Sequence, residues 1–96
     1  MKKLLIMCGA GHATSTIVRN KVEQWLDSEG LRNTVEIRQS AVASEIDNIQ
    51  DGHYDAVLTT TQVPSYIQDK VINGLAILTG VGANVVFDQI KEQLNL

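Results

Sequence analysis

The chain has 96 residues, 44% of them hydrophobic, and a formal net charge of -3 at pH 7, a composition typical of one globular domain spanning residues 1–96. Its eight Lys and Arg residues are scattered, so no basic stripe is available for a phosphate backbone and no nucleic-acid partner is expected. The single cysteine cannot form an internal disulfide, which favours a reducing compartment and predicts a cytoplasmic protein. The apolar run Leu4–Met7 is too short for a signal peptide or a membrane span, so direct membrane insertion is not expected.

The first half of the chain predicts a strand, a helix and a second strand. Leu4–Met7 is continuously apolar and ends at Cys8, which indicates a central strand buried on both faces. From Ser15 onward, apolar residues recur at helical spacing until Gly30, a residue type that often follows a helix end, so we expect an amphipathic helix of about four turns. Apolar and polar residues alternate over Thr34–Gln39, which predicts an edge strand buried on one face.

The second half predicts two further strands and three helices. Apolar residues at helical spacing over Val42–Ile49 indicate a short helix before the turn at Asp51 and Gly52. Two short apolar runs are expected to be central or near-central strands, with a short helix between them and a final helix after them. In chain order these four elements are the strand Ala56–Leu58, the helix within Val63–Asn73, the strand Leu75–Leu78 and the helix over Val86–Leu94.

Strands that alternate with helices predict an α/β fold with an open, four-stranded parallel sheet and helices on both faces. Right-handed crossovers give the strand order 2-1-3-4 most simply, with the first strand in the interior of the sheet. Ligands of such sheets bind beyond the carboxyl ends of the strands, where the winding reverses, here between the first and third strands. Cys8 lies at that point in the sequence.

Mostly small residues follow Cys8 and lead into the first helix, which lets the backbone approach a ligand closely. A helix N-terminus binds phosphate with unpaired N–H groups and partial positive charge, and the same field favours the reactive thiolate of a nearby cysteine. We therefore predict that Cys8 is a nucleophile within a phosphate-binding loop. The loop residues are Gly9, Ala10, Gly11, His12, Ala13, Thr14, Ser15 and Thr16.

Two simpler interpretations stay open at this point. Cys8 could be a buried structural cysteine, since free cysteines in proteins are usually hidden and inert. His12 could be a proton donor or cationic partner for the phosphate, or a solvent-facing loop histidine without a role. The pattern predicts neither a metal site nor a bound cofactor.

Groups that the loop lacks separate a phosphate carrier from a phosphatase. A cysteine phosphatase of this architecture needs an arginine six residues after the cysteine, where this chain has Thr14. It also needs a general acid, which such phosphatases carry in an Asp-Pro pair, whereas the single proline, Pro64, follows Val63. Without those groups a thiophosphate could form but would hydrolyse slowly, which is the behaviour that a carrier requires.

Two other classes of protein remain as alternatives. The first is a small cysteine-dependent phosphatase or an arsenate reductase-like enzyme, against which the missing arginine and the missing second cysteine argue. The second is a non-catalytic domain that binds nucleotide at the glycine loop. The chain lacks the Gly-Lys-Ser or Gly-Lys-Thr ending of a P-loop, and it also lacks the dinucleotide-binding fingerprint Gly-x-Gly-x-x-Gly. The sequence therefore does not support nucleotide binding.

Over its whole length the chain resembles the galactitol-type IIB components of sugar phosphotransferase systems. The resemblance is carried by Lys-Leu-Leu-Ile-Met-Cys-Gly-Ala-Gly at residues 3–11, by Ala-Thr-Ser-Thr at residues 13–16, by Gly74 and by Leu-Thr-Gly-Val-Gly at residues 78–82. It implies the IIB fold that is similar to low-molecular-weight phosphatases. It further implies that Cys8 accepts phosphate from a phosphohistidine of a IIA partner and donates it to a galactitol-like sugar or sugar alcohol bound by the membrane permease IIC. Association with a membrane would then come through IIC.

Overall fold

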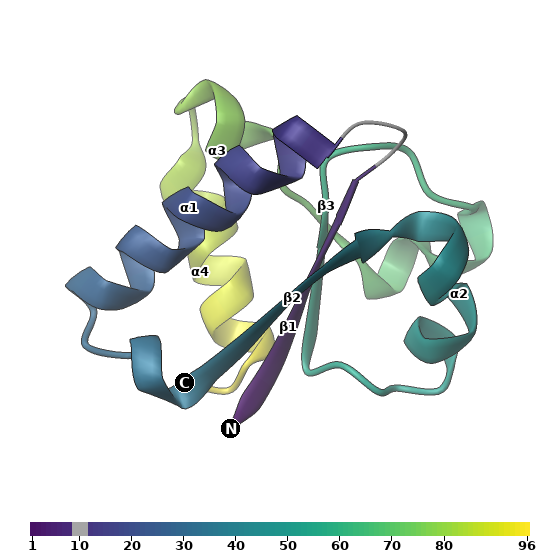
Figure 1. Ribbon diagram of the computed structural model, residues 1–96, viewed down its shortest axis with the longest axis horizontal. Helices are drawn as coiled ribbons and strands as arrows, with labels where there is room; N and C mark the ends of the chain where they lie inside the picture. Colours follow the sequence, from purple (N-terminus) through teal and green to yellow (C-terminus); the bar gives the residue numbers. More distant parts are fainter. Residues whose placement is uncertain (9–11) are drawn as a thin grey trace.

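The computed structural model describes the backbone of residues 1–8 and 12–96, and the side chains of residues 1–7 and 15–96 (Figure 1). Strands and helices alternate over most of the chain. The strands are β1 (Lys2–Cys8), β2 (Val35–Ala41), β3 (Ala56–Thr59) and β4 (Ile72–Asn73). The helices are α1 (His12–Ser28), α2 (Val42–Gln50), α3 (Leu75–Thr79) and α4 (Ala83–Gln93), with short 3-10 helices η1 (Arg32–Thr34) and η2 (Ser65–Lys70).

The four strands form one parallel sheet in the order β2-β1-β3-β4, which confirms the predicted fold class and strand order. Strand β1 lies between β2 and β3, and its Ile6 is level with Gln39 of β2 and Leu58 of β3. Because β1 is covered on both faces, Leu4–Met7 are all fully buried, as the continuous apolar run predicts.

Helices cover both faces of the sheet, and the side chains of β1 alternate between the two layers. On one face, Leu4 and Ile6 pack with buried residues of α1, α3 and α4, and the rings of Trp25 and Phe87 stack between α1 and α4 with centroids 4.7 Å apart. On the other face, Leu5 and Met7 pack against α2 and η2. Figure 1 shows α1, α3 and α4 grouped on one side of the strands and α2 on the other.

The end of α1 and the start of β2 agree with the sequence prediction, apart from one residue. Gly30 has a φ of 70°, and the backbone N–H of Leu31 donates to the carbonyl of Leu26 at 2.8 Å, which closes the helix end. Thr34, predicted to begin the strand, lies in η1 instead, because its hydroxyl donates to the carbonyl of Leu31 at 2.7 Å. Strand β2 is at the edge of the sheet, as expected.

The prediction of a near-central strand at Leu75–Leu78 is wrong, because those residues lie in helix α3. The fourth strand is the two-residue β4, which precedes them at the edge of the sheet. Likewise, the helix predicted within Val63–Asn73 is the 3-10 helix Ser65–Lys70, and the end of that segment forms β4.

Gly74 turns the chain from β4 into α3. Its N–H donates to the carbonyl of Thr59 at 2.7 Å, and the Asn73 side chain accepts from the N–H of Leu75 at 3.0 Å, so the first N–H of α3 has a partner. A Cβ at position 74 would lie 2.8 Å from Cγ of Leu58, so this close approach to the sheet requires glycine. As a helix, the segment turns Ile77 into the core.

Candidate functional site

The carboxyl ends of the parallel strands lie at one edge of the sheet, which we call the carboxyl edge. Cys8 is the last residue of β1, and its Cα is level with Ala41 at the end of β2. Helix α1 begins at His12, so its N-terminus, with its partial positive charge, follows Cys8 closely in the chain. The backbone therefore places Cys8 where β2 and β3 flank the central strand, which is the switch point expected from the sequence.

Part of the predicted loop lies outside the described residues. This holds for Gly9, Ala10 and Gly11 entirely, and for the side chains of four further positions, namely Cys8, His12, Ala13 and Thr14. Phosphate binding by these residues stays a prediction. Ser15 and Thr16, the last two predicted loop residues, have described side chains in the first turns of α1.

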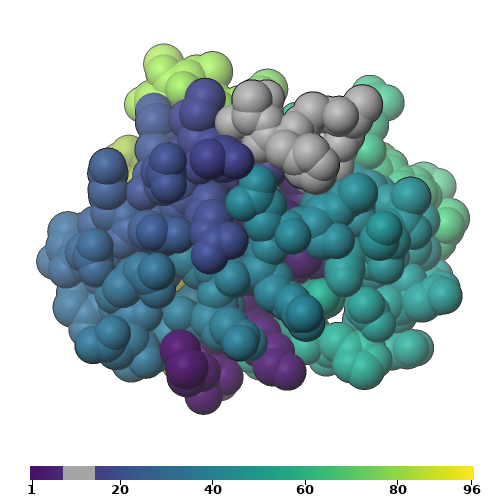
Figure 2. Space-filling view, viewed as in Figure 1, coloured from purple at the N-terminus to yellow at the C-terminus, as the bar shows by residue number. Residues whose placement is uncertain are grey.

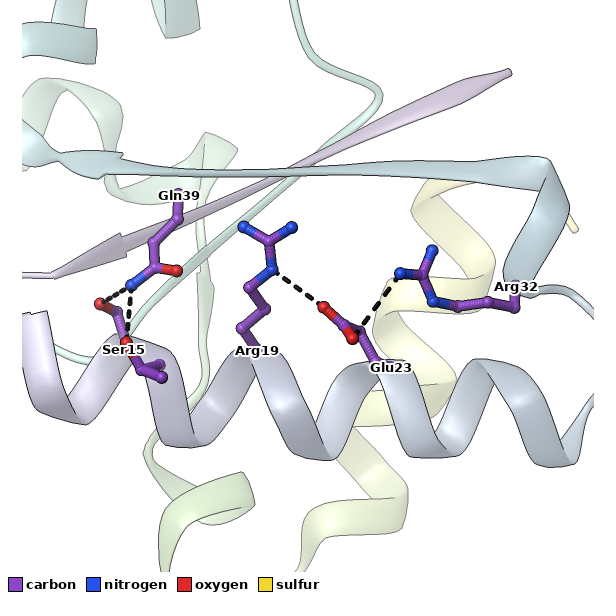
Figure 3. A network of polar contacts seen from close by, with 6 residues as sticks. Ser15, Arg19, Glu23, Arg32 and Gln39 are labelled. Atoms are coloured by element: carbon purple, nitrogen blue, oxygen red, sulfur yellow. Dashed lines mark hydrogen bonds and ion pairs between the residues drawn. The ribbon is translucent and has the colours of Figure 1, made fainter.

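The side chain of Gln39 in β2 forms hydrogen bonds with the hydroxyls of Ser15 and Thr16. The Nε2 atom of Gln39 donates to Ser15 Oγ at 2.6 Å and lies 3.2 Å from Thr16 Oγ1 (Figure 3). Ser15 is fully buried, so its hydroxyl depends on partners within the protein. Gln39 thereby ties the start of α1 to the strand beside β1. Sequence reasoning placed Gln39 in the edge strand but assigned it no part in the site.

We expect Gln39→Leu to weaken this end of the fold and to slow the phosphoryl transfer that the sequence predicts for Cys8. Loss of the donor to a buried hydroxyl should lower the free energy of unfolding by about 1–2 kcal/mol, measured by urea denaturation. A displaced start of α1 should slow acceptance of phosphate by roughly threefold to tenfold. Gln24→Leu is the matched control, because Gln24 is an exposed glutamine of α1. Equal behaviour of the two variants would contradict a positioning role for Gln39.

The first arginine after Cys8 is engaged further along α1. Arg19 Nε lies 2.9 Å from Glu23 Oε1, and Arg32 Nη2 lies 3.6 Å from Glu23 Oε2 (Figure 3). The carboxylate of Glu23 therefore holds two guanidinium groups between α1 and η1. Arg19 is thus not a ready substitute for the arginine that is missing at position 14.

A pocket of about 400 Å³ opens at the ends of β3 and β4. None of its lining residues is charged: they are Thr59, Thr60, Thr61, Gln62, Val63, Gln68, Val71, Asn73 and Leu75. Met7 of β1 is level with Thr59, the last residue of β3, so Cys8 at the end of β1 and Thr60, which follows β3, lie at the same height. The Thr59 hydroxyl donates to the carbonyl of Thr61 at 3.0 Å and accepts from its N–H at 3.2 Å, which shapes the turn beside the pocket.

A shifted pKa on the α2 side of the sheet belongs to a structural pair rather than to this site. Burial and the hydrogen bond to the Glu45 carboxylate raise the pKa of Tyr54 above its ordinary value of 10.0. The Tyr54 hydroxyl lies 2.8 Å from Glu45 Oε1, and Glu45 itself is buried. This pair satisfies a buried carboxylate of α2 and joins that helix to the start of β3.

Comparison with known proteins points to one family. A sequence model described as "PTS system, Lactose/Cellobiose specific IIB subunit" matches residues 3–94. A protein of Escherichia coli (strain K12) named "Putative phosphotransferase enzyme IIB component SgcB" is 32% identical over 94 residues, which make up 98% of this chain and 98% of the relative. Both matches span Cys8, the start of α1 and the residues that line the pocket at the ends of β3 and β4.

Proposed function

The chain belongs to the IIB components of the sugar phosphotransferase system, and from that membership we propose that it carries phosphate on Cys8. The observation that carries the proposal is the position of Cys8 at the end of the central strand, followed within a few residues by the N-terminus of α1. Backbone N–H groups at a helix start bind the phosphoryl oxygens and favour a thiolate over a thiol.

The proposed reaction consists of two balanced transfers. In the first, the Cys8 thiolate attacks the phosphorus of a phosphohistidine, the S–P bond forms and the P–N bond breaks. The imidazole then leaves as a neutral ring if its other nitrogen carries a proton. In the second, a hydroxyl oxygen of the acceptor attacks the phosphorus, the S–P bond breaks and the thiolate is regenerated, while the hydroxyl proton passes to a base. The residues following Cys8 would stabilise the charge that moves among the phosphoryl oxygens.

Components of the IIB type work with IIA and IIC components, and we propose the corresponding partners here. A IIA phosphohistidine protein would supply the phosphate, and a IIC permease with its bound sugar would receive it. Among the helices in the described parts of the chain, none is long and apolar enough to cross a membrane. From the family membership we propose that the protein works in the cytoplasm and reaches the membrane through IIC.

Galactitol, or a similar sugar alcohol, is the acceptor that we propose. The residues that support it are those of the resemblance, chiefly residues 3–11 and 78–82. The matching family model is named for lactose and cellobiose, so those two sugars are the natural comparison in any acceptor assay.

The test of the carrier function offers the purified protein three phosphoryl donors: a phosphorylated IIA protein, p-nitrophenyl phosphate and ATP. We expect labelling from the first alone, followed by discharge to sugar when membranes containing IIC are added. Rapid turnover of p-nitrophenyl phosphate would instead identify a phosphatase, and labelling from ATP would identify a nucleotide-dependent enzyme. Either result would contradict the proposal.

A further inference from the structure

Two cations of the sheet lie on its α2 face without a carboxylate partner. Side chains alternate along a strand, so Lys3 of β1 lies on the same face as Leu5, which packs against α2 and η2. Arg38 of β2 is level with Leu5 and therefore lies on that face too. Neither cation belongs to any ion pair among the described residues, whereas the chain's other two arginines share the carboxylate of Glu23.

A small polar pocket lies beside these two cations. Its volume is about 140 Å³, and it is lined by Lys3, Arg38, Asn48, His53 and Tyr54. The lining therefore combines an ammonium, a guanidinium and an imidazole, and it contains no carboxylate. Pockets that hold drug-sized ligands measure roughly 300–1,000 Å³, so this one suits a small ion rather than a nucleotide.

The buried carboxylate of Glu45 fixes one wall of the pocket without lining it. Its Oε1 accepts from the Tyr54 hydroxyl at 2.8 Å and from Asn48 Nδ2 at 3.2 Å. Burial and Glu45 raise the pKa of Tyr54, and the Arg38 guanidinium opposes them, which places Arg38 beside the Tyr54 hydroxyl. A guanidinium has five N–H donors, so Arg38 keeps donors for a ligand in the pocket.

Three further carboxylates around the pocket do not neutralise the two cations. Asp55 Oδ2 accepts from the backbone N–H of Lys3 at 2.7 Å, and Asp51 Oδ2 lies 3.9 Å from His53 Nε2. Glu36 is level with Lys3 on β2, but it is exposed and forms no ion pair within the described parts of the chain. The charges of the ammonium and the guanidinium are thus available to an anion from solution.

We propose that this pocket binds a phosphate dianion, either inorganic phosphate or the phosphoryl group of a small phosphate monoester. A dianion matches the two unpaired cations in charge, and its oxygens can accept from the guanidinium fork, the ammonium and the imidazole together. Lys3 precedes Cys8 by five residues of β1, or about 16 Å of extended strand. The pocket is therefore a second phosphate site, separate from Cys8, and the proposal does not depend on the carrier function.

The two ends of the molecule keep these sites apart. Figure 1 shows the start of β1 at the opposite end of the molecule from the start of α1, and Figure 2 shows the start of the chain, in purple, exposed at that end. A phosphate held beside Lys3 is out of reach of the thiol at the carboxyl edge. The pocket thus binds phosphate without reacting with it.

A dianion suits the pocket better than a carboxylate or a lipid surface. A carboxylate brings one negative charge and would leave one of the two cations unmatched. An anionic membrane attracts a cluster of several exposed basic residues, whereas here the basic groups converge on a concavity with Glu36, Asp51 and Asp55 around it.

The test is an NMR titration of the ¹⁵N-labelled chain with inorganic phosphate, at constant ionic strength and above the second pKa of phosphate. We expect saturable shifts at the amides of Lys3, Arg38 and His53, with a Kd of about 1–10 mM. Arg38→Gln and Lys3→Gln should each weaken binding by about tenfold, and both replace exposed side chains, so the fold should persist. Arg32→Gln and Lys2→Gln remove the same charge outside the pocket and should bind as the parent does.

Two further ligands define the anion. Equal affinity for inorganic phosphate and glycerol 3-phosphate would assign the site to the phosphoryl group alone, and tenfold tighter binding of the ester would assign it to phosphate monoesters. Three results would overturn the proposal: shifts that rise without saturation, acetate that binds as tightly as phosphate, or control variants that bind as weakly as the pocket variants. Saturable shifts confined to the start of α1 would also overturn it, while leaving the proposed role of Cys8 intact.

Discussion

Replacement of Cys8 by serine is expected to abolish acceptance of phosphate from IIA. A thiol ionises readily near neutral pH, and a helix N-terminus favours its anion further, whereas a serine hydroxyl stays protonated without a dedicated base. The substitution replaces one sulfur atom with oxygen at the end of a strand whose preceding residues Leu4–Met7 are fully buried, so the fold should persist.

The measurement is transfer of ³²P from phosphorylated IIA to the parent and to the Cys8→Ser chain. Acid stability identifies the linkage, since phosphohistidine and thiophosphate differ in their response to pH. His12→Gln and His53→Gln are the matched controls, because they remove the chain's two histidines, the other side chains that could accept phosphate through nitrogen. Undiminished labelling of Cys8→Ser together with its loss in His12→Gln would transfer the carrier role to His12.

The fold was predictable wherever the apolar pattern had one structural solution. The run Leu4–Met7 is buried on both faces because β1 lies inside the sheet, and Gly30 closes α1 with a positive φ. The alternating burial of Val35 and Ile37 belongs to the edge strand β2. In each case the period of the pattern and the burial of the element agree.

The fourth strand was not predictable in the same way. Four consecutive apolar residues, Leu75–Leu78, fit a buried strand or a short helix equally well, and periodicity cannot separate the two over that length. Tertiary contacts decide it: Gly74 bonds to Thr59 at the end of β3, which completes β4 after two residues and leaves the following residues to cover the sheet as α3.

Some features of the candidate site were likewise predictable from the sequence and others were not. The place of Cys8 followed from strand order, because the switch point is a property of topology. The bond from Gln39 to Ser15 depends on the register of β1 with β2, which a single sequence does not determine.

Thr14→Arg is expected to change the fate of the phosphorylated protein. Position 14 is six residues after Cys8, the spacing at which a phosphatase places its arginine, and it lies in the first turn of α1. A guanidinium fork there would bind the phosphoryl oxygens bidentately, in place of the amides and hydroxyls that we propose for the parent. Tighter binding of the phosphoryl group either raises the barrier to its transfer to sugar or stabilises the transition state for attack by water. We therefore expect discharge to sugar to slow, or hydrolysis to accelerate, by about tenfold or more.

Two lifetimes decide the outcome: that of the phosphorylated protein alone, and that after addition of membranes containing IIC and sugar. Thr14→Lys supplies the same charge without the fork, so a larger effect of Arg than of Lys would attribute the change to bidentate geometry. A cation at a helix N-terminus costs about 0.3–1 kcal/mol, too little to unfold the domain and measurable equally in both variants. If both lifetimes match the parent in Thr14→Arg, the missing arginine does not distinguish carrier from hydrolase. The explanation for a long-lived thiophosphate would then have to lie in the absence of a general acid, since Pro64 follows Val63 and not Asp.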